Sequence, residues 1–395
     1  GPERCVNYQA PSRPLSAGPL PGIARLDNNS TLHTLPGETR SDCEPPTGGK
    51  RPPDYWKIGV KTLIRALITS ALFLLLLGAC GKDKDDDATA PFGGRYEPLA
   101  SEKTLITGAT ILTGAGERLD DADILLVDGL IDDVGDGLSR RGATVIDATG
   151  KWVTPGIIDV HSHLGVYASP GTRSHSDGNE STAPVTAEVW AEHSVWPQDP
   201  GFTTALAGGV TALQILPGSA NLIGGRGVTL KNVPGRNVMD MKFPGAPHGL
   251  KMACGENPKR VYGGRSQAPA TRMGNVAGYR ASWIDAVDYR DKLAAAEDGD
   301  GEAPKRDLKL ETLVGVLEGE ILVHNHCYRA DEMSIMLDLA KEFGYKITAF
   351  HHAVEAYKIA DLLAEADTCA AVWADWWGFK MEAYDGIREN AAIVD

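Results

Sequence analysis

The feature that most constrains the fold of this 395-residue chain is a pattern repeated through its second half. A short apolar strand ends in a polar cluster, a helical stretch follows, and the next strand begins. Strands that alternate with helices are typical of a parallel sheet, and polar clusters at several strand ends are typical of a (β/α)8 TIM barrel. The expected strands span 156–160, 208–216, 249–252, 320–323 and 345–350. A doubly wound sheet is the alternative, but no Gly-rich phosphate loop follows the first strand.

Two other patterns complete the expected α/β fold. Apolar residues at helical spacing predict a helix from Ala330 to Phe343. Short β-branched runs separated by Gly and Asp predict a small N-terminal β-sandwich over 103–155, ahead of the barrel at 156–395.

The first hundred residues have the composition of a leader. Residues 1–59 show no apolar periodicity, which indicates a disordered extension or sequence upstream of the true start. Residues 60–80 combine Lys61 and Arg65 with an apolar run and then Gly78-Ala79-Cys80, which resembles a lipoprotein signal peptide with a lipobox. A buried helix with a coincidental Cys is the alternative. We expect lipidation at Cys80, a tether over 81–102, and anchoring in a bacterial cell envelope, at the periplasmic face of the outer membrane.

Charge and cysteine content exclude two classes of protein. The formal net charge of −14 argues against a nucleic acid as the main partner, because phosphate binding needs a basic face. Six cysteines are too few for a disulfide scaffold. Cys254 and Cys327 lack C-x-x-C spacing, so they are interpreted as packing residues rather than thiolate ligands.

Histidines gather at the expected strand ends. They occur as pairs or near-pairs, namely His161/His163, His324/His326 and His351/His352. Imidazole binds Zn²⁺ well, and positions i and i+2 of a strand point the same way. His161 and His163 can therefore reach one metal ion from a single strand end.

The segment W-V-T-P-G-I-I-D-V-H-S-H-L-G resembles the first barrel strand of the metal-dependent amidohydrolase superfamily, and the chain is most similar to its imidazolonepropionase-like members. The resemblance covers roughly residues 103–395. It implies a metal-dependent hydrolase of small-molecule amide or cyclic amide C–N bonds, with one or two divalent ions, expected to be Zn, and metal-activated water. A dipeptidase or N-acyl-amino-acid deacylase of the same superfamily is the alternative.

The resemblance also implies a ligand set. His161 and His163 match the first-strand ligands, and Lys251 matches a lysine that is carboxylated and bridges two metals in many members. His324 best matches the strand-five ligand and His352 the strand-six ligand. His326 and His351 remain open as metal ligands, substrate contacts or supporting residues.

One expected part has no match, namely the strand-eight Asp that serves the superfamily as ligand and base. The sequence is therefore predicted to be truncated before strand eight, and an inactive binding lipoprotein or gene fragment stays open as an alternative. Weaker substrate-binding candidates are Arg226 in a Gly-rich loop, His248 near Lys251, and Arg329 before the helix at 330–343. No nucleic acid partner is expected, and the sequence predicts no oligomeric state.

Overall fold

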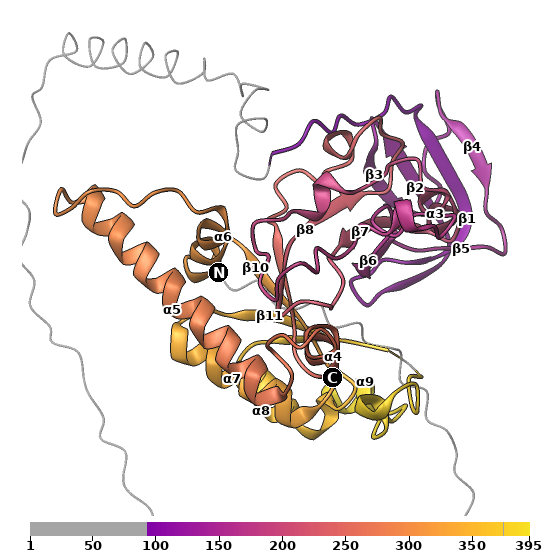
Figure 1. Ribbon diagram of the computed structural model, residues 1–395. Coiled ribbons are helices and arrows are strands. Elements are labelled where there is room, and N and C mark those ends of the chain that lie inside the picture. The colour runs from indigo at the N-terminus through magenta and orange to yellow at the C-terminus, as the bar shows by residue number, and fades with distance from the viewer. Residues whose placement is uncertain (1–92, 374) are drawn as a thin grey trace, which may run out of the picture. The chain divides into compact units, whose positions relative to one another are not determined.

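The computed structural model describes residues 93–395 with the exception of Ala374 (Figure 1). The predicted leader, signal peptide, Cys80 and residues 81–92 of the tether lie outside the described residues. Two β-sheets and the helices packed on them make up the described part. Within it, no helix combines the length and apolar character needed to cross a lipid bilayer.

The smaller sheet comes first in the chain. Its strands are β1 (Thr104–Leu112), β2 (Arg118–Val127), β3 (Leu130–Gly135), β4 (Thr144–Asp147) and β5 (Trp152–Val153). The order is β3-β2-β1-β4, and β5 pairs with β1. Leu105, Ile111 and Ile124 are buried, whereas Leu130 and Ile131 are exposed. The described strands therefore form one sheet with its core on one face, and the β-sandwich stays a prediction of which this sheet is one layer.

A tight turn joins β2 to β3. Asp128 and Gly129 have φ angles of 52° and 77°, and Val127 pairs with Leu130 across the hairpin. Two positive φ angles are typical of a type I′ turn, whose twist matches that of the flanking strands. Asp-Gly is a preferred sequence for this turn because Gly pays no steric cost there.

The larger sheet carries the histidine-rich strand ends. Its strands are β6 (Ile157–Ser162), β7 (Val210–Ile215), β8 (Ile223–Lys231), β9 (Gly249–Ala253), β10 (Leu322–Cys327), β11 (Ile347–His352) and β12 (Cys369–Val372). They follow the order β12-β11-β10-β9-β8-β7-β6, so β6 and β12 stand at opposite ends of a nearly closed barrel. The barrel prediction is confirmed in this respect.

Strand β8 departs from the predicted parallel sheet. It runs antiparallel to both β7 and β9, whereas β6 with β7, β9 with β10, β10 with β11, and β11 with β12 are parallel. The connection from Ile215 to Ile223 is too short for a crossover, which needs about a dozen residues. This Gly-rich segment was predicted to be a loop, and that prediction is wrong.

Helices cover the outer face of the larger sheet. The α-helices are α3 (Pro200–Ala207), α4 (Glu256–Gly263), α5 (Arg272–Glu297), α6 (Leu308–Leu317), α7 (Ala330–Phe343), α8 (Ala360–Glu365) and α9 (Asn390–Val394). Short 3-10 turns are η1 (Arg173–His175), η2 (Ala191–His193), η3 (Val238–Asp240), η4 (Ala356–Lys358) and η5 (Met381–Ala383). The predicted helix 330–343 is confirmed as α7, and it ends at Gly344 with φ of 78°.

The largest core lies between these helices and the strands. Leu250 and Phe350 of the sheet belong to the same fully buried cluster as Trp283 of α5 and Met333 of α7. Figure 1 shows α5 and α7 next to each other, on the same side of β10 and β11. The helices pack on one face of these strands. Residues that alternate with the core positions therefore point to the opposite face of the sheet.

Candidate functional site

Six histidines and one lysine meet at the C-terminal ends of four strands. They are His161 and His163 from β6 and its end, Lys251 from β9, His324 and His326 from β10, and His351 and His352 from β11. The ladder register brings them together, because His324 pairs with Lys251 and His326 pairs with His351. The structure therefore gathers all seven residues that the sequence singled out as expected or possible metal ligands.

Histidine 351 links the two sides of this histidine cluster. Its Nδ1 lies 2.9 Å from Nδ1 of His161, and its Nε2 lies 2.9 Å from Nδ1 of His324. On the far side, Nε2 of His324 lies 2.9 Å from Nε2 of Gln214 on β7. Both ring nitrogens of His351 and of His324 are thus engaged inside the protein.

His326 and His352 are engaged differently. Their rings meet edge to face with centroids 4.4 Å apart, and the Nδ1 atom of each is buried and has no hydrogen-bond partner among residues 93–373 and 375–395. Buried polar atoms are rarely left without a partner in native proteins. His352 also has φ of 71° and the next residue, Ala353, φ of 39°, a conformation that L-residues avoid and that is often found at functional sites.

Burial keeps the imidazoles uncharged. It lowers the pKa of His163 to about 4, of His324 to about 3 and of His352 to about 2, and the charge of Lys251 lowers each of them further. The pKa values of His161, His326 and His351 are also lowered, again chiefly by burial. Neutral imidazole is the form that binds metal ions.

Lys251 is the most buried charged group of the cluster, with 1% of its surface exposed. Its Nζ donates to the carbonyl oxygen of Pro217 at 2.8 Å. Burial lowers its pKa to about 7, so at neutral pH a large fraction of the side chain is an amine with a free lone pair.

The donor set fits a divalent cation such as Zn²⁺. In the described part of the chain, no three His, Cys, Asp or Glu side chains already surround one point as a finished ion site. However, Nε2 of His161 and Nε2 of His163 lie 3.3 Å apart. Two nitrogens on one tetrahedral Zn²⁺, each about 2.0–2.1 Å from it, are separated by about 3.3 Å. His163 Nδ1–H donates to Leu216 O at 2.8 Å, so its Nε2 carries the lone pair.

An aromatic wall borders the histidine cluster. The ring of His352 stacks on Trp376 at 5.0 Å and 12° and on Tyr328 at 5.0 Å and 17°. Trp373 meets both His352 and His161, with centroids 4.4 Å and 5.2 Å away. These rings exclude water from one side of the cluster.

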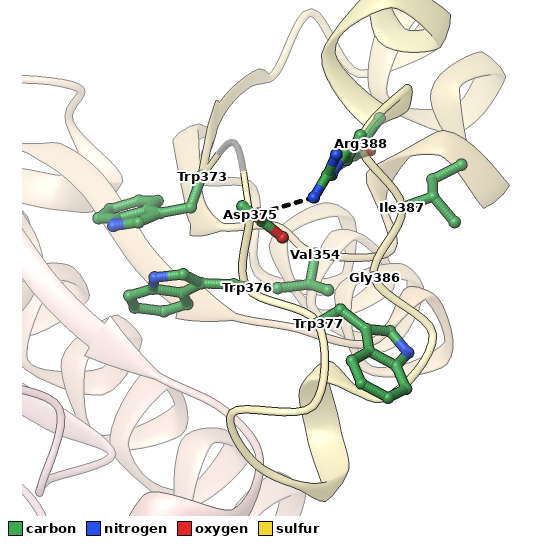
Figure 2. Close-up of a pocket in the computed structure, with 9 residues that line it drawn as sticks. Val354, Trp373, Asp375, Trp376, Trp377, Gly386, Ile387 and Arg388 are labelled. Atoms are coloured by element: carbon green, nitrogen blue, oxygen red, sulfur yellow. Dashed lines mark hydrogen bonds and ion pairs between the residues drawn. The ribbon is translucent and has the colours of Figure 1, made fainter.

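Behind this wall lies a cavity of about 290 Å³ (Figure 2). Val354, the three tryptophans 373, 376 and 377, and Ile387 line it together with an ion pair between Arg388 and Asp375, at 3.2 Å. In Figure 2 the rings of Trp373 and Trp376 extend to the same side of the loop that carries them, and the Asp375 carboxylate turns toward Arg388 instead. Asp375 thus faces the cavity.

The three weaker candidates have other partners. Arg226 lies within β8, stacks 4.2 Å from the Trp190 ring, and donates to Thr312 of α6. His248 lies 3.3 Å from the Glu192 carboxylate and packs edge to face on Trp190. Arg329 donates to Asp331 at 3.0 Å. A substrate role for these three stays a prediction that no contact in the structure supports.

Two polar residues of the site were missed from the sequence. Gln214 is the one amide in the apolar strand β7 and holds His324. Asn257 follows β9 and places its Nδ2 3.4 Å from Nε2 of His326 and 2.9 Å from Ser219 Oγ. A polar residue at an inward position of an otherwise apolar strand is a signal that could have found Gln214.

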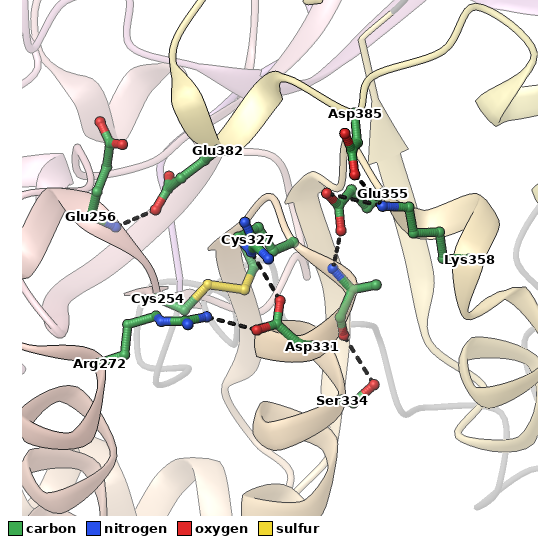
Figure 3. A network of polar contacts seen from close by, with 12 residues as sticks. Cys254, Glu256, Arg272, Cys327, Asp331, Ser334, Glu355, Lys358, Glu382 and Asp385 are labelled. Carbon is green, nitrogen blue, oxygen red and sulfur yellow. Dashed lines mark hydrogen bonds and ion pairs between the residues drawn. A yellow bond between two sulfur atoms is a disulfide. The ribbon is translucent and has the colours of Figure 1, made fainter.

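The interpretation of Cys254 and Cys327 as packing residues is wrong, because they form a disulfide (Figure 3). Cys254 follows β9 directly, and Cys327 is the last residue of β10. The pairing was not visible in the sequence, since 73 residues separate the two cysteines.

Known proteins that are similar to this chain include amidohydrolases and a dihydroorotase. No family model matches the chain. The amidohydrolase tasK of Hapsidospora irregularis is 33% identical over a match that covers 78% of this chain and 34% of that protein. The crystal structure of an amidohydrolase from Thermotoga maritima MSB8 matches with a TM-score of 0.70 and 38% identity, over 74% of this chain and 76% of that one. A dihydroorotase of Streptomyces coelicolor is 26% identical over half of each chain. The chain spans about a third of the length of the tasK relative.

Proposed function

The chain belongs to the amidohydrolase superfamily, and we propose that it hydrolyses an amide or cyclic amide of a small molecule with metal-activated water. Its relatives named amidohydrolase, dihydroorotase and deaminase are hydrolases of carbon–nitrogen bonds. The observation that carries the proposal is the cluster of neutral, buried histidines around Lys251 at the strand ends. Zn²⁺ is the ion that we expect, because imidazole is among its preferred ligands.

The hydrogen bonds divide the histidines into two groups. His161 and His163 direct Nε2 toward a common point, and His326 and His352 each keep a buried nitrogen that has no partner in the described part of the chain. We assign these four, with Lys251, as the residues that would hold the metal. His324 and His351 have both nitrogens engaged, so their proposed role is to orient the others. This changes the sequence-based preference for His324 as the strand-five ligand to His326.

When bound, the ion would lower the pKa of a water molecule to near 7 and polarise the substrate carbonyl. The chain's own residues prepare for it. Leu216 O fixes the tautomer of His163, and burial keeps Lys251 partly neutral, which is the form that can react with carbon dioxide to give a carboxylate-like ligand. The aromatic wall keeps bulk water away from the reacting groups.

The proposed location is an oxidising compartment, the bacterial cell envelope, with a lipid anchor at Cys80. Two separate features support it. The first is the lipobox-like sequence at 78–80. The second is the disulfide between Cys254 and Cys327, since disulfides persist in oxidising compartments and are rare in the cytosol.

The test is metal content and hydrolysis of the purified protein. We expect transition metal in the wild type, and activity on part of a panel of cyclic amides, N-acyl amino acids and dipeptides. His161→Ala combined with His163→Ala should remove both. The matched control is His175→Ala, a half-buried histidine of η1 that contacts Pro170 O and lies outside the histidine cluster. The proposal would be contradicted by wild-type protein that holds no transition metal, or by a double variant that still hydrolyses substrate.

A further inference from the structure

The disulfide lies where the candidate ligands are carried. Cys254 and Cys327 are both buried, with 4% and 0% of their surfaces exposed, and their Cα atoms are 5.2 Å apart. Ala253, directly before Cys254, pairs with His326, directly before Cys327. The bridge therefore ties β9 to β10 one position beyond the level of His326.

Backbone hydrogen bonds of the two cysteines also reach β10 and the end of β11. The Cys254 N–H donates to the carbonyl oxygen of His326 at 2.9 Å, and Cys327 O accepts from Ala353 N at 2.9 Å. Cys327 also pairs with His352 in the ladder between β10 and β11. Each cysteine is thus bonded through its backbone to the backbone of a candidate ligand or of its neighbour.

The β9–β10 ladder restrains this region, as do two buried hydrogen bonds from α5, in which Tyr279 donates to Ala253 O and Asn275 to Gly255 O. The disulfide adds a covalent link between the two strands. Between Cys254 and the start of β10 the chain forms helices α4, α5 and α6, so a long helical connection joins β9 to β10. In Figure 3 the disulfide stands between the Glu256–Glu382 contact and the Arg272–Asp331 ion pair. The ion pair is about half exposed on both sides, and such pairs restrain geometry weakly.

We propose that the Cys254–Cys327 disulfide is a positioning element of the metal site, which holds the ends of β9 and β10 so that Lys251 and His326 reach the same ion. This inference rests on the proposed function. Its consequence is sensitivity to thiol reductants. Dithiothreitol would give two electrons and two protons to the S–S bond, which becomes two thiols, while the reagent closes to its cyclic disulfide.

The experiment measures Zn²⁺ affinity of the full chain before and after reduction. The metal-free protein is treated with dithiothreitol, mass spectrometry verifies free thiols at Cys254 and Cys327, and zinc is titrated against a chelating dye. We expect at least tenfold weaker zinc binding after reduction, with faster amide exchange at residues 249–254 and 322–327. The Cys254→Ala/Cys327→Ala variant should bind zinc as weakly as the reduced wild type and should not respond to dithiothreitol.

A control separates positioning from general destabilisation. Leu363→Ala removes a buried leucine of α8 that lies outside the histidine cluster. It should lower the melting temperature and leave the zinc affinity unchanged. If the reduced wild type and the double cysteine variant both bind zinc within twofold of the oxidised protein, the inference is overturned and the proposed function is not affected. Oxidised wild type that binds no zinc would overturn the proposed function, and the inference with it.

Discussion

The Nε2 atoms of His161 and His163 lie 3.3 Å apart at the end of β6. They belong to residues i and i+2, whose side chains share one face of the strand. The spacing matches that of two ligands on one Zn²⁺ ion, so a single strand end supplies a ready pair of donors.

The first prediction concerns His351, which holds His161 and His324 through its two ring nitrogens. His351→Ala should weaken zinc binding about 10–100-fold while the protein still folds, because supporting partners of metal ligands typically contribute that much. Zinc titration monitored by a chelating dye measures the effect. His175→Ala is the control, and equal affinities of His351→Ala and wild type would show that His351 has no orienting role.

The second prediction is acid sensitivity of the metal-free protein. Burial lowers the pKa of His163 from 6.5 to about 4, so below pH 6.5 the unfolded chain takes up a proton that the folded chain resists. The free energy of unfolding should therefore fall as pH decreases from 6.5 to 4, and His324 and His352 should extend the loss to lower pH. Urea denaturation at several pH values measures this slope. His163→Phe should make it shallower, and an unchanged slope would contradict the stated cause.

The third prediction compares two buried lysines. Lys251 donates a hydrogen bond to Pro217 O, and burial lowers its pKa to about 7. Lys251→Met should abolish zinc binding yet stabilise the metal-free fold, by about 1 kcal/mol at pH 6, since functional residues are often held at a cost in stability. The gain should shrink as pH rises from 7 toward 10.5, because the folded side chain is then neutral and the unfolded chain, whose pKa is 10.5, loses the same proton progressively more easily.

Lys242 is the matched control. It is equally buried but pairs with the Glu192 carboxylate at 2.8 Å. Lys242→Met should destabilise the fold by about 3–5 kcal/mol, because it removes the ammonium group that neutralises the buried Glu192 carboxylate. Thermal and urea denaturation distinguish the two signs, and destabilisation by Lys251→Met at pH 6 would contradict the argument.

The fourth prediction concerns Gly249 at the start of β9. A Cβ atom there would lie 2.6 Å from Cδ2 of His324, so the glycine leaves room for that ring. Gly249→Ala should destabilise the protein by about 1–3 kcal/mol through overpacking and should displace His324 from Gln214. Gly301→Ala, where the new methyl group meets nothing within 4 Å, should change stability by less than about 0.5 kcal/mol. Equal effects of the two substitutions would be the contrary result.

Some parts of the fold could be predicted from the sequence and others could not. Helix α7 was predicted to the residue, because its apolar spacing is regular and Gly344 ends it. The histidine cluster was predicted because each pair follows an apolar strand. The orientation of β8 was not, since its glycines read as a loop and its partners on β7 and β9 are tertiary contacts.

Within the candidate site, the sequence left His324 and His326 as alternatives. Strand alternation directs both to the same face, so spacing alone cannot separate them. Their different roles follow from Gln214 and His351, which lie on other strands and occupy both nitrogens of His324 alone. The Cys254–Cys327 pairing was equally hidden, because it depends on register between two strands far apart in the sequence.

The antiparallel strand β8 also bears on how the chain reaches this structure. Its pairing with β7 closes a short loop, whereas each parallel pair must wait for a crossover segment to form. Short loops close at a lower entropic cost, so we expect the β7–β8 hairpin to form early. The candidate metal ligands, which come from β6 on one side and from β9, β10 and β11 on the other, would then assemble on both sides of a pre-formed β7–β8 pair.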